Sequence, residues 1–161
     1  MLAVPSLSLF TSKNRITTQL NTLARAINMA RVSAVTLNNI VTLCRSDNQE
    51  QCHGKWHDGM ILFIDYNGDH IVNGDDYFLA KFEKIPENDI IFWRAFQSRQ
   101  YLQMSPKGFT RFQNGTFTYC PKEGLEYSRG IILNAQGRVR FTKDDDRDGI
   151  DEGANGKPLR C

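Results

Sequence analysis

The stretch that decides the fold is SKNRITTQLNTLARAINMARVSAVTL, residues 12–37. Apolar residues recur along it at alternating steps of four and three, which places them on one face of an α-helix. They are Ile16, Leu20, Leu23, Ile27, Ala30, Ala34 and Leu37. The opposite face is polar, and no Pro or Gly interrupts the run. Because a helix with one apolar face is not stable alone, this stretch predicts a long amphipathic helix that lies on a sheet.

The segment before it, MLAVPSLSLF at residues 1–10, is uncharged and mostly apolar. Ten helical residues extend about 15 Å, roughly half the thickness of a bilayer, so this segment cannot cross a membrane alone. It also lacks the basic start and the cleavage site of a signal peptide. We expect it to be the trailing end of a longer apolar helix, so that residues 1–37 form the C-terminal part of that helix. The alternative is a start methionine followed by a disordered tail.

After residue 37 the period of the sequence changes. Short β-branched and aromatic runs bounded by turn residues predict strands at 40–44, 60–64, 78–82, 90–93, 116–120, 130–133 and 138–141. Asn-Gly or Gln-Gly pairs at 67–68, 73–74, 114–115 and 136–137 are typical of tight hairpins. The prediction is an α+β fold in which a long N-terminal α-helix packs on an antiparallel β-sheet domain, residues 38–161. A length of 161 residues suits one domain.

Charge and motifs exclude several classes of function. The formal net charge of +2 is too small to indicate nucleic-acid binding by itself, so the placement of charge matters more than its total. The sequence contains no G-x-S-x-G, no H-E-x-x-H and no phosphate-binding glycine loop. We therefore predict that the protein is not an enzyme.

The four cysteines are Cys44, Cys52, Cys120 and Cys161. They form no C-x-x-C pair, which argues against a structural zinc site. Two disulfides are the better interpretation, and they indicate an oxidising compartment such as a periplasm or a cell surface. Three pairings of the four cysteines are possible.

The order of several motifs along the chain resembles the FimT/GspH family of minor pilins and pseudopilins. The motifs are LARAINMARVSAVTLNN (23–39), VTLCRS (41–46) with the short loop to Cys52, W-x-D-G-M-I-L-F-I-D-Y-N-G-D (56–69), NGTFTYC (114–120), IILNAQGRVRF (131–141) and PLRC (158–161). The resemblance implies a pilin-like fold, a β-sandwich laid against the C-terminal half of the helix. It also implies the pairing Cys44 with Cys52 and Cys120 with Cys161.

The family also implies a location and partners. Its members carry a hydrophobic N-terminal helix that anchors the subunit in the inner membrane before assembly and packs in the filament core afterwards. The globular domain is periplasmic. The expected partners are other minor pilins or pseudopilins in a pilus or pseudopilus, and the inner membrane through a helix that would precede the present sequence.

The last predicted hairpin suggests a DNA-binding site. FimT-type pilins resemble this chain in carrying G-R-x-R there, here Gly137, Arg138, Val139 and Arg140, a motif associated with DNA binding in natural transformation. Residues two apart in a strand share a face, so both guanidinium groups should point outward while Val139 faces the core. We predict non-specific binding of double-stranded DNA, with Lys143 as a third contact. Three phosphate contacts predict a roughly 40-fold loss of affinity between 50 and 200 mM salt.

Two alternatives remain for this hairpin. Exposed R-x-R strands are often no more than solvated faces, and the chain could equally be a GspH-like structural pseudopilin of type II secretion that does not bind DNA. A run of acidic residues directly after the hairpin would repel a polyanion. It comprises Asp144, Asp145, Asp146, Asp148, Asp151 and Glu152.

The same acidic run is a weak candidate for a calcium site, and no other cofactor is expected. Asp144, Asp146 and Asp148 alternate and Gly149 follows, which is similar to the start of calcium-binding D-x-D-x-D-G loops. The alternative is a solvated, mobile loop. A calcium-dependent adhesive domain is therefore a third class of function.

A second acidic loop, residues 65–76, has EF-hand-like spacing, but His70 stands at the sixth position, where the sharp turn needs Gly. We predict a hairpin turn there instead of a metal site.

The many aromatic residues between 90 and 120 have two interpretations as well. They could fill the core or, since basic residues lie among them, form a stacking platform for single-stranded bases.

Overall fold

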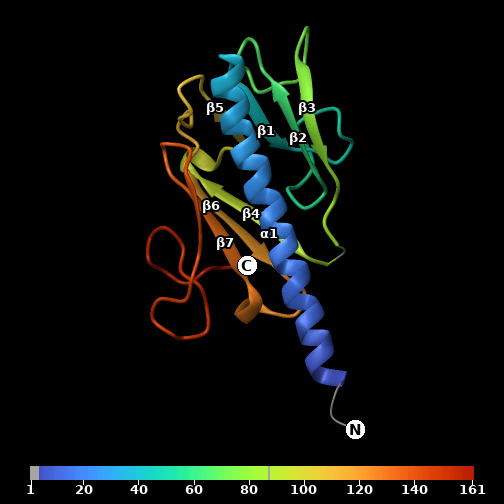
Figure 1. Ribbon diagram of the computed structural model, residues 1–161, viewed down its shortest axis with the longest axis vertical. Coiled ribbons are helices and arrows are strands. Elements are labelled where there is room, and N and C mark those ends of the chain that lie inside the picture. Colours follow the sequence, from blue (N-terminus) through green and yellow to red (C-terminus); the bar gives the residue numbers. More distant parts are fainter. Residues whose placement is uncertain (1–3, 87) are drawn as a thin grey trace.

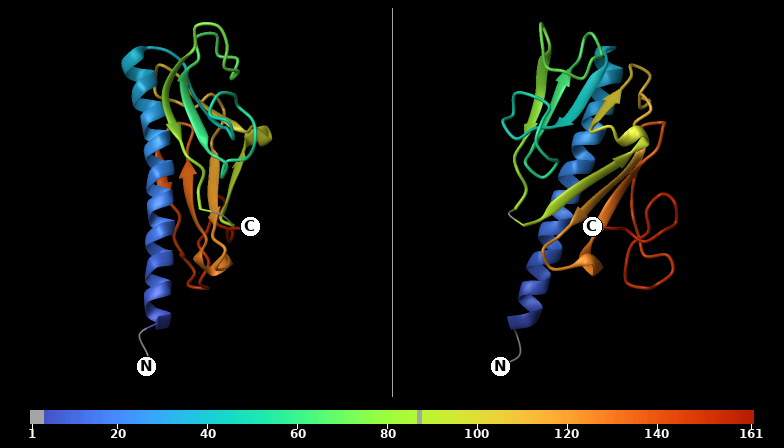
Figure 2. Two further views of the ribbon diagram at one scale, coloured as in Figure 1. Left: turned by 90° about the vertical axis from the view of Figure 1, so that its right-hand side faces the viewer. Right: turned by 180° about the vertical axis from the view of Figure 1, so that it is seen from behind.

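The computed structural model describes residues 4–86 and 88–161, in which one long helix lies along two antiparallel sheets (Figure 1). Each sheet has four strands, in the orders β3-β2-β1-β5 and β4-β6-β7-β8. Both sheets lie on the same side of the helix (Figure 2). The elements are α1 (Val4–Leu37), β1 (Val41–Arg45), β2 (Met60–Ile64), β3 (Tyr77–Phe82), β4 (Ile90–Ala95), η1 (Phe96–Ser98), β5 (Tyr101–Met104), β6 (Gly115–Cys120), η2 (Leu125–Tyr127), β7 (Arg129–Leu133) and β8 (Val139–Phe141). The predicted α+β, pilin-like architecture is confirmed.

Helix α1 starts at Val4, so the described part of the apolar segment 1–10 is helical as expected, whereas residues 1–3 lie outside the described residues. The helix ends where expected. Pro5 lies in its first turn, where a missing N–H costs no helical hydrogen bond. At the other end, Asn38 has a φ of 52°, and the Asn39 N–H donates to the carbonyl of Ala34 over 3.2 Å. This left-handed residue ends the helix and turns the chain into β1. Within the described residues, no helix is both long enough and apolar enough to cross a membrane.

The apolar stripe of α1 forms one side of the core. Its first six members, from Ile16 to Ala34, are all buried, together with Ala24 and Ala26. Leu37 was predicted to belong to the stripe, and this is wrong: 42% of it is exposed because the helix ends there and the chain turns away. Residues of both sheets join the stripe in one cluster. Near its middle, the Trp93 and Phe117 rings stack with centroids 4.1 Å apart.

The strands agree with the prediction to within two residues, apart from β5. This strand was missed because its sequence, YLQM, has no β-branched residue. Only the Gln136-Gly137 pair lies in a short hairpin. The pairs at 67–68 and 73–74 fall in one long connection between β2 and β3, and the pair at 114–115 leads into β6 from the other sheet, so the expectation of tight hairpins there is wrong.

Two disulfides close loops on the two sheets, with the pairing that the resemblance implies. Cys44 on β1 is bonded to Cys52, with Cα atoms 5.5 Å apart. Cys120 at the end of β6 is bonded to Cys161, with Cα atoms 5.8 Å apart. The second bond fixes the C-terminal loops (red in Figure 1) to the sheet that contains β8.

Candidate nucleic-acid interface

The β7–β8 hairpin is held by a tight turn at residues 134–138. The Gly137 N–H donates to the Asn134 carbonyl over 3.0 Å, and the Asn134 side-chain oxygen accepts from the Arg138 N–H over 3.0 Å. Gly137 has a φ of +73°, and a Cβ there would lie 2.4 Å from the carbonyl oxygen of Gly108. Glycine is therefore required by both the backbone conformation and the close approach of the 105–110 loop.

Arg138 and Arg140 leave this turn with exposed side chains, while Val139 between them is half-buried against the core. Arg138 lies just before β8 and not inside it, so the predicted strand 138–141 starts one residue too early. Within the described parts of the chain, neither guanidinium has a hydrogen-bond or carboxylate partner. Two unpaired positive charges thus lie at the start of the edge strand β8.

Lys143, the third predicted contact, has a different environment. Its Nζ lies 2.9 Å from Oδ1 of Asp145, and both side chains are mostly exposed. A surface ion pair of this kind contributes little stability, so DNA phosphate can compete for Lys143. The ion pair with Asp145 nevertheless offsets the charge of Lys143, so Arg138 and Arg140 are the main candidates for contacts with DNA.

Two further basic residues lie beside the hairpin and were not identified from the sequence. Arg31 of α1 donates from Nε to the carbonyl of Gly108 over 3.1 Å. Its side chain lies beside Gly137, where a Cβ would be 3.1 Å from the Arg31 Cδ. Lys107 is exposed in the same 105–110 loop, which hydrogen-bonds to the hairpin through the Thr110 N–H and the Ala135 carbonyl. These residues are far from Arg138 in sequence, so no local pattern could reveal that they are neighbours.

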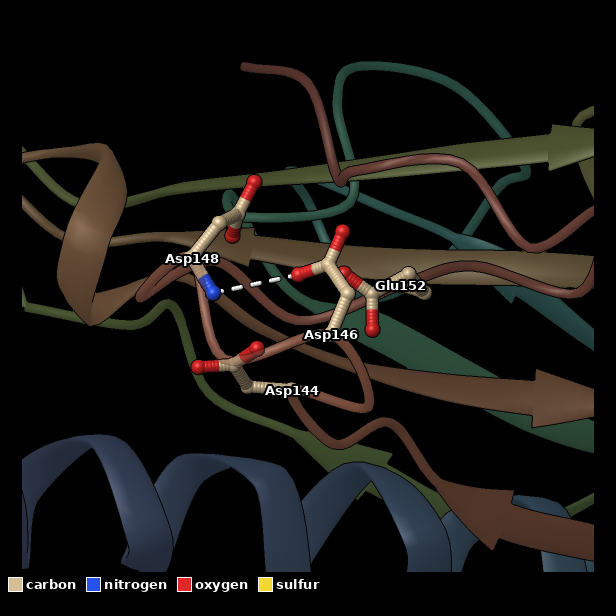
Figure 3. A group of neighbouring side chains, drawn as sticks. All are labelled: Asp144, Asp146, Asp148 and Glu152. Atoms are coloured by element: carbon tan, nitrogen blue, oxygen red, sulfur yellow. Dashed lines mark hydrogen bonds between the residues drawn. The ribbon is translucent and has the colours of Figure 1, made fainter.

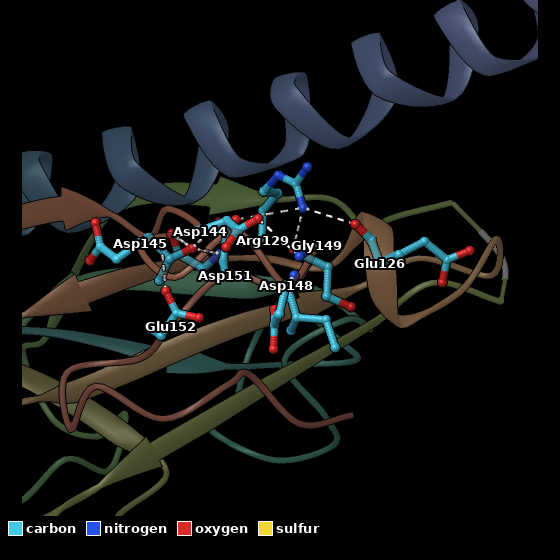
Figure 4. A network of polar contacts seen from close by, with 12 residues as sticks. Glu126, Arg129, Asp144, Asp145, Asp148, Gly149, Asp151 and Glu152 are labelled. Atoms are coloured by element: carbon cyan, nitrogen blue, oxygen red, sulfur yellow. Dashed lines mark hydrogen bonds and ion pairs between the residues drawn. The ribbon is translucent and has the colours of Figure 1, made fainter.

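The acidic run after β8 folds into a compact loop (Figures 3 and 4). Carboxylate oxygens of four of its residues lie within 4.8 Å of one another: Asp144, Asp146, Asp148 and Glu152. Asp151 is buried outside this group, where it accepts from the Thr142 hydroxyl over 2.7 Å and lies 3.8 Å from Nη1 of Arg129. The acidic loop is therefore close in sequence to Arg140, but none of its carboxylates pairs with that residue in the described chain.

The loop at residues 65–76 joins the antiparallel strands β2 and β3, so a hairpin connection is present as predicted, but it is longer than a tight turn. Its centre is Asp65, which is fully buried and accepts hydrogen bonds from the Thr42 hydroxyl (2.7 Å) and the Gln103 amide (2.9 Å). Its oxygens also accept from the backbone N–H groups of residues 68, 69 and 70. Both oxygens of this carboxylate are thus fully used in holding the loop together.

A second polar site, which sequence reasoning missed, joins α1 to the β4-β6-β7-β8 sheet. Arg15 donates from Nε to Asp89 over 2.9 Å and from Nη2 to Glu123 over 2.6 Å. Asp89 is buried and also accepts from the Tyr119 hydroxyl and, over 2.9 Å, from the Lys122 N–H. The partners lie 74 or more positions from Arg15, so periodicity carries no signal for them.

This network shifts the ionisation of its members. The hydrogen bond from Arg15 lowers the pKa of Glu123 from 4.5 to about 2. Burial, and then the hydrogen bond to the Asp89 carboxylate, raises the pKa of the Tyr119 hydroxyl. The hydrogen bond to Glu123 raises the pKa of Arg15 despite partial burial. The charges here are mutually satisfied, so the network serves the fold and offers nothing to an external anion.

The aromatic residues between 90 and 120 are partly in the core and partly on the surface. Trp93, Phe117 and Tyr119 are buried in the core. Others are exposed, among them Phe96, Phe109 and Phe112. Phe109 lies in the 105–110 loop, which hydrogen-bonds to the β7–β8 hairpin through Thr110 and Ala135.

Comparison with known proteins gives the family. Residues 19–137, well over half of the chain, match the family model described as type II transport protein GspH. The chain belongs to the GspH family. The match ends at Gly137, so it covers the hairpin turn but neither Arg138 nor Arg140. No curated protein matches this GspH-family chain in sequence.

Solved structures with the same fold come from both pili and secretion systems. The type IV minor pilin FimU of Pseudomonas aeruginosa aligns with a TM-score of 0.65 at 15% identity, covering 83% of this chain and 92% of that chain. The minor pseudopilin EpsH of the Vibrio cholerae type 2 secretion system aligns with a TM-score of 0.56 at 7% identity, covering 79% and 95%. At these identities the GspH-family chain shares the fold with both.

Proposed function

We propose that this protein is a minor type IV pilin of the FimT kind that binds double-stranded DNA without sequence preference for uptake in natural transformation. The observation that carries the proposal is the pair of exposed guanidinium groups of Arg138 and Arg140. Arg140 lies on edge strand β8 and Arg138 lies directly before it. Both are exposed, with the half-buried Val139 between them, and neither has a carboxylate partner in the described chain. Guanidinium forks match the geometry of phosphate oxygens, and phosphate contacts supply non-specific affinity for DNA.

The surroundings of the pair support the same function. Arg31 lies beside Gly137, Lys107 is exposed in the 105–110 loop that bonds to the hairpin, and Lys143 follows β8, so each adds positive charge near the two arginines. The likeness to a type IV minor pilin is compatible with a filament that carries such a surface out of the cell. The protein would be anchored in the inner membrane before assembly and would then join other minor pilins, with its globular domain in the periplasm.

The test is a titration of a labelled DNA duplex with the protein, read by fluorescence anisotropy at several salt concentrations. Two arginine contacts predict that affinity falls about 12-fold between 50 and 200 mM salt, rising to about 40-fold when a third group takes part. The double variant Arg138→Gln, Arg140→Gln should lose nearly all of this dependence. Circular dichroism establishes that each protein is folded.

A matched control removes two exposed positive charges from the other sheet, with Lys55→Gln and Lys81→Gln. Lys81 lies on β3, at the far edge of the β3-β2-β1-β5 sheet, and Lys55 lies in the loop before β2. The control should bind DNA as the unmodified protein does. Equal losses in both double variants would show that total charge, and not the hairpin, determines binding.

The second candidate is a structural minor pseudopilin of type II secretion that does not bind DNA. Two observations favour it: the likeness to EpsH, and the acidic loop that directly follows β8 and lowers the local potential. In this case the titration would show no salt-dependent binding by either the unmodified protein or the variants. Its partners would be other pseudopilins.

A further inference from the structure

The acidic loop after β8 carries four carboxylates that converge from a stretch of nine residues. Oxygens of Asp144, Asp146, Asp148 and Glu152 all lie within 4.8 Å of one another. In Figure 3 the Glu152 carboxylate is drawn beside that of Asp146, with the carboxylates of Asp144 and Asp148 nearby. Four negative charges this close repel one another, and solvent screens the exposed Asp146 and Asp148 better than the buried Glu152.

The second, independent observation concerns Glu152. Only 7% of this residue is exposed, and its Oε2 accepts from the Asp145 N–H over 2.6 Å. Its Oε1 is buried and has no hydrogen-bond partner among the described residues. A buried carboxylate oxygen without a partner is costly, and such an oxygen beside three other carboxylates indicates a missing positive ligand.

Basic residues near the loop do not supply this positive charge. Lys143 pairs with Asp145, and Arg129 lies against Asp151, both of which are outside the group of four (Figure 4). Within residues 4–86 and 88–161, no Lys or Arg forms an ion pair with any of the four carboxylates. Backbone N–H groups of residues 145 and 147–150 donate to the four carboxylates, but no side-chain cation of the described chain offsets their charge.

We propose that Asp144, Asp146, Asp148 and Glu152 bind one calcium ion. All four donors are carboxylate oxygens, which suit hard cations and not zinc or copper. Calcium accepts six to eight oxygens in flexible geometry, so water or backbone carbonyls can complete the shell, whereas magnesium demands a near-ideal octahedron. Gly149, with a φ of +95°, allows the sharp turn that brings Glu152 back toward the three aspartates.

The proposal adds a ligand that sequence spacing did not assign. A standard EF-hand loop places its glutamate six residues after the glycine, whereas Glu152 lies three residues after Gly149. The Glu152 N–H also donates to the Lys143 carbonyl over 3.1 Å, which joins the two ends of the loop. A bound ion would therefore hold the loop closed beside the β7–β8 hairpin.

The experiment is isothermal titration of the chelator-treated full chain with calcium chloride. We expect one site with a dissociation constant of about 10⁻⁴ to 10⁻³ M, the range of extracellular calcium modules. Glu152→Gln and Asp148→Asn should each weaken binding at least tenfold. Asp145→Asn is the matched control, because it removes one charge from the same loop but no proposed ligand, and it should bind nearly as the unmodified protein does.

Several results would overturn the proposal. They are the absence of any heat of binding up to about 10 mM calcium, an equal affinity for magnesium chloride, or an equal loss in Asp145→Asn and Asp148→Asn. Asp148 is exposed, so its variant decides the question even when Glu152→Gln does not fold. The DNA titration without calcium is a separate measurement, and its outcome does not depend on this site.

Discussion

Arginines have opposite roles in two regions of this protein. Arg15 lies between α1 and a sheet, where Asp89 and Glu123 satisfy its charge. Arg140 on edge strand β8 and Arg138 directly before it are exposed and without side-chain partners in the described chain. An arginine whose charge is already paired contributes to stability, whereas one that is unpaired and exposed is free to bind an external anion. The difference separates the part of the molecule that maintains the fold from the part that we propose binds DNA.

Of the variants that test this comparison, Arg15→Gln should lower the free energy of unfolding most. Removal of the guanidinium leaves the buried Asp89 carboxylate without its counter-charge, so the free energy of unfolding should fall by about 3 kcal/mol. Urea denaturation measures the loss. Arg25→Gln, an exposed change on the same helix, is the control and should have little effect. Equal losses in the two variants would contradict the role given to Arg15.

Gly137→Ala should cause the second-largest loss of stability. It tests how firmly the hairpin backbone is fixed. A left-handed alanine is strained, and its Cβ would meet the Gly108 carbonyl at 2.4 Å, so we expect a loss of about 2 kcal/mol. Gly74→Ala is the matched control, since Gly74 also has a positive φ but open space around it. Similar losses in both would mean that the contact with Gly108 does not matter.

Glu123→Gln tests the paired charge of Arg15 through the pH dependence of stability. The folded pKa of about 2 lies below the ordinary 4.5, so the charged form stabilises the fold above pH 4.5, and this stabilisation is lost as the pH falls toward 2. At pH 7 the variant should be less stable by about 1 kcal/mol, because the pair is partly exposed. Thermal unfolding at both pH values measures the difference, which should vanish near pH 2. A loss that persists in acid would exclude this linkage.

The smallest effect on stability should come from the double variant Arg138→Gln, Arg140→Gln. Neither side chain has a partner in the described chain, so the free energy of unfolding should change by less than about 0.5 kcal/mol. The same urea denaturation provides the measurement. A large loss would mean that these arginines support the fold, and the comparison with Arg15 would no longer hold.

The sequence predicted the parts of the structure that depend on local periodicity. The stripe from Ile16 to Ala34 and the alternation around Val139 both follow from the geometry of a single element. The Arg15–Asp89 contact and the packing of Arg31 beside Gly137 depend on how distant elements are placed, for which a single sequence carries no signal. The burial of Glu152 was missed for the same reason, because spacing alone cannot show which acidic side chain turns inward.

The bond between Cys120 and Cys161 turns residues 121–160 into a covalent ring that contains β7, β8 and the acidic loop. A protease that cuts the exposed loop once would leave a single molecule, and the two fragments would separate on a gel after reduction but not before it. The surface proposed to meet DNA is thus carried on a segment that stays attached to the molecule after a single cut.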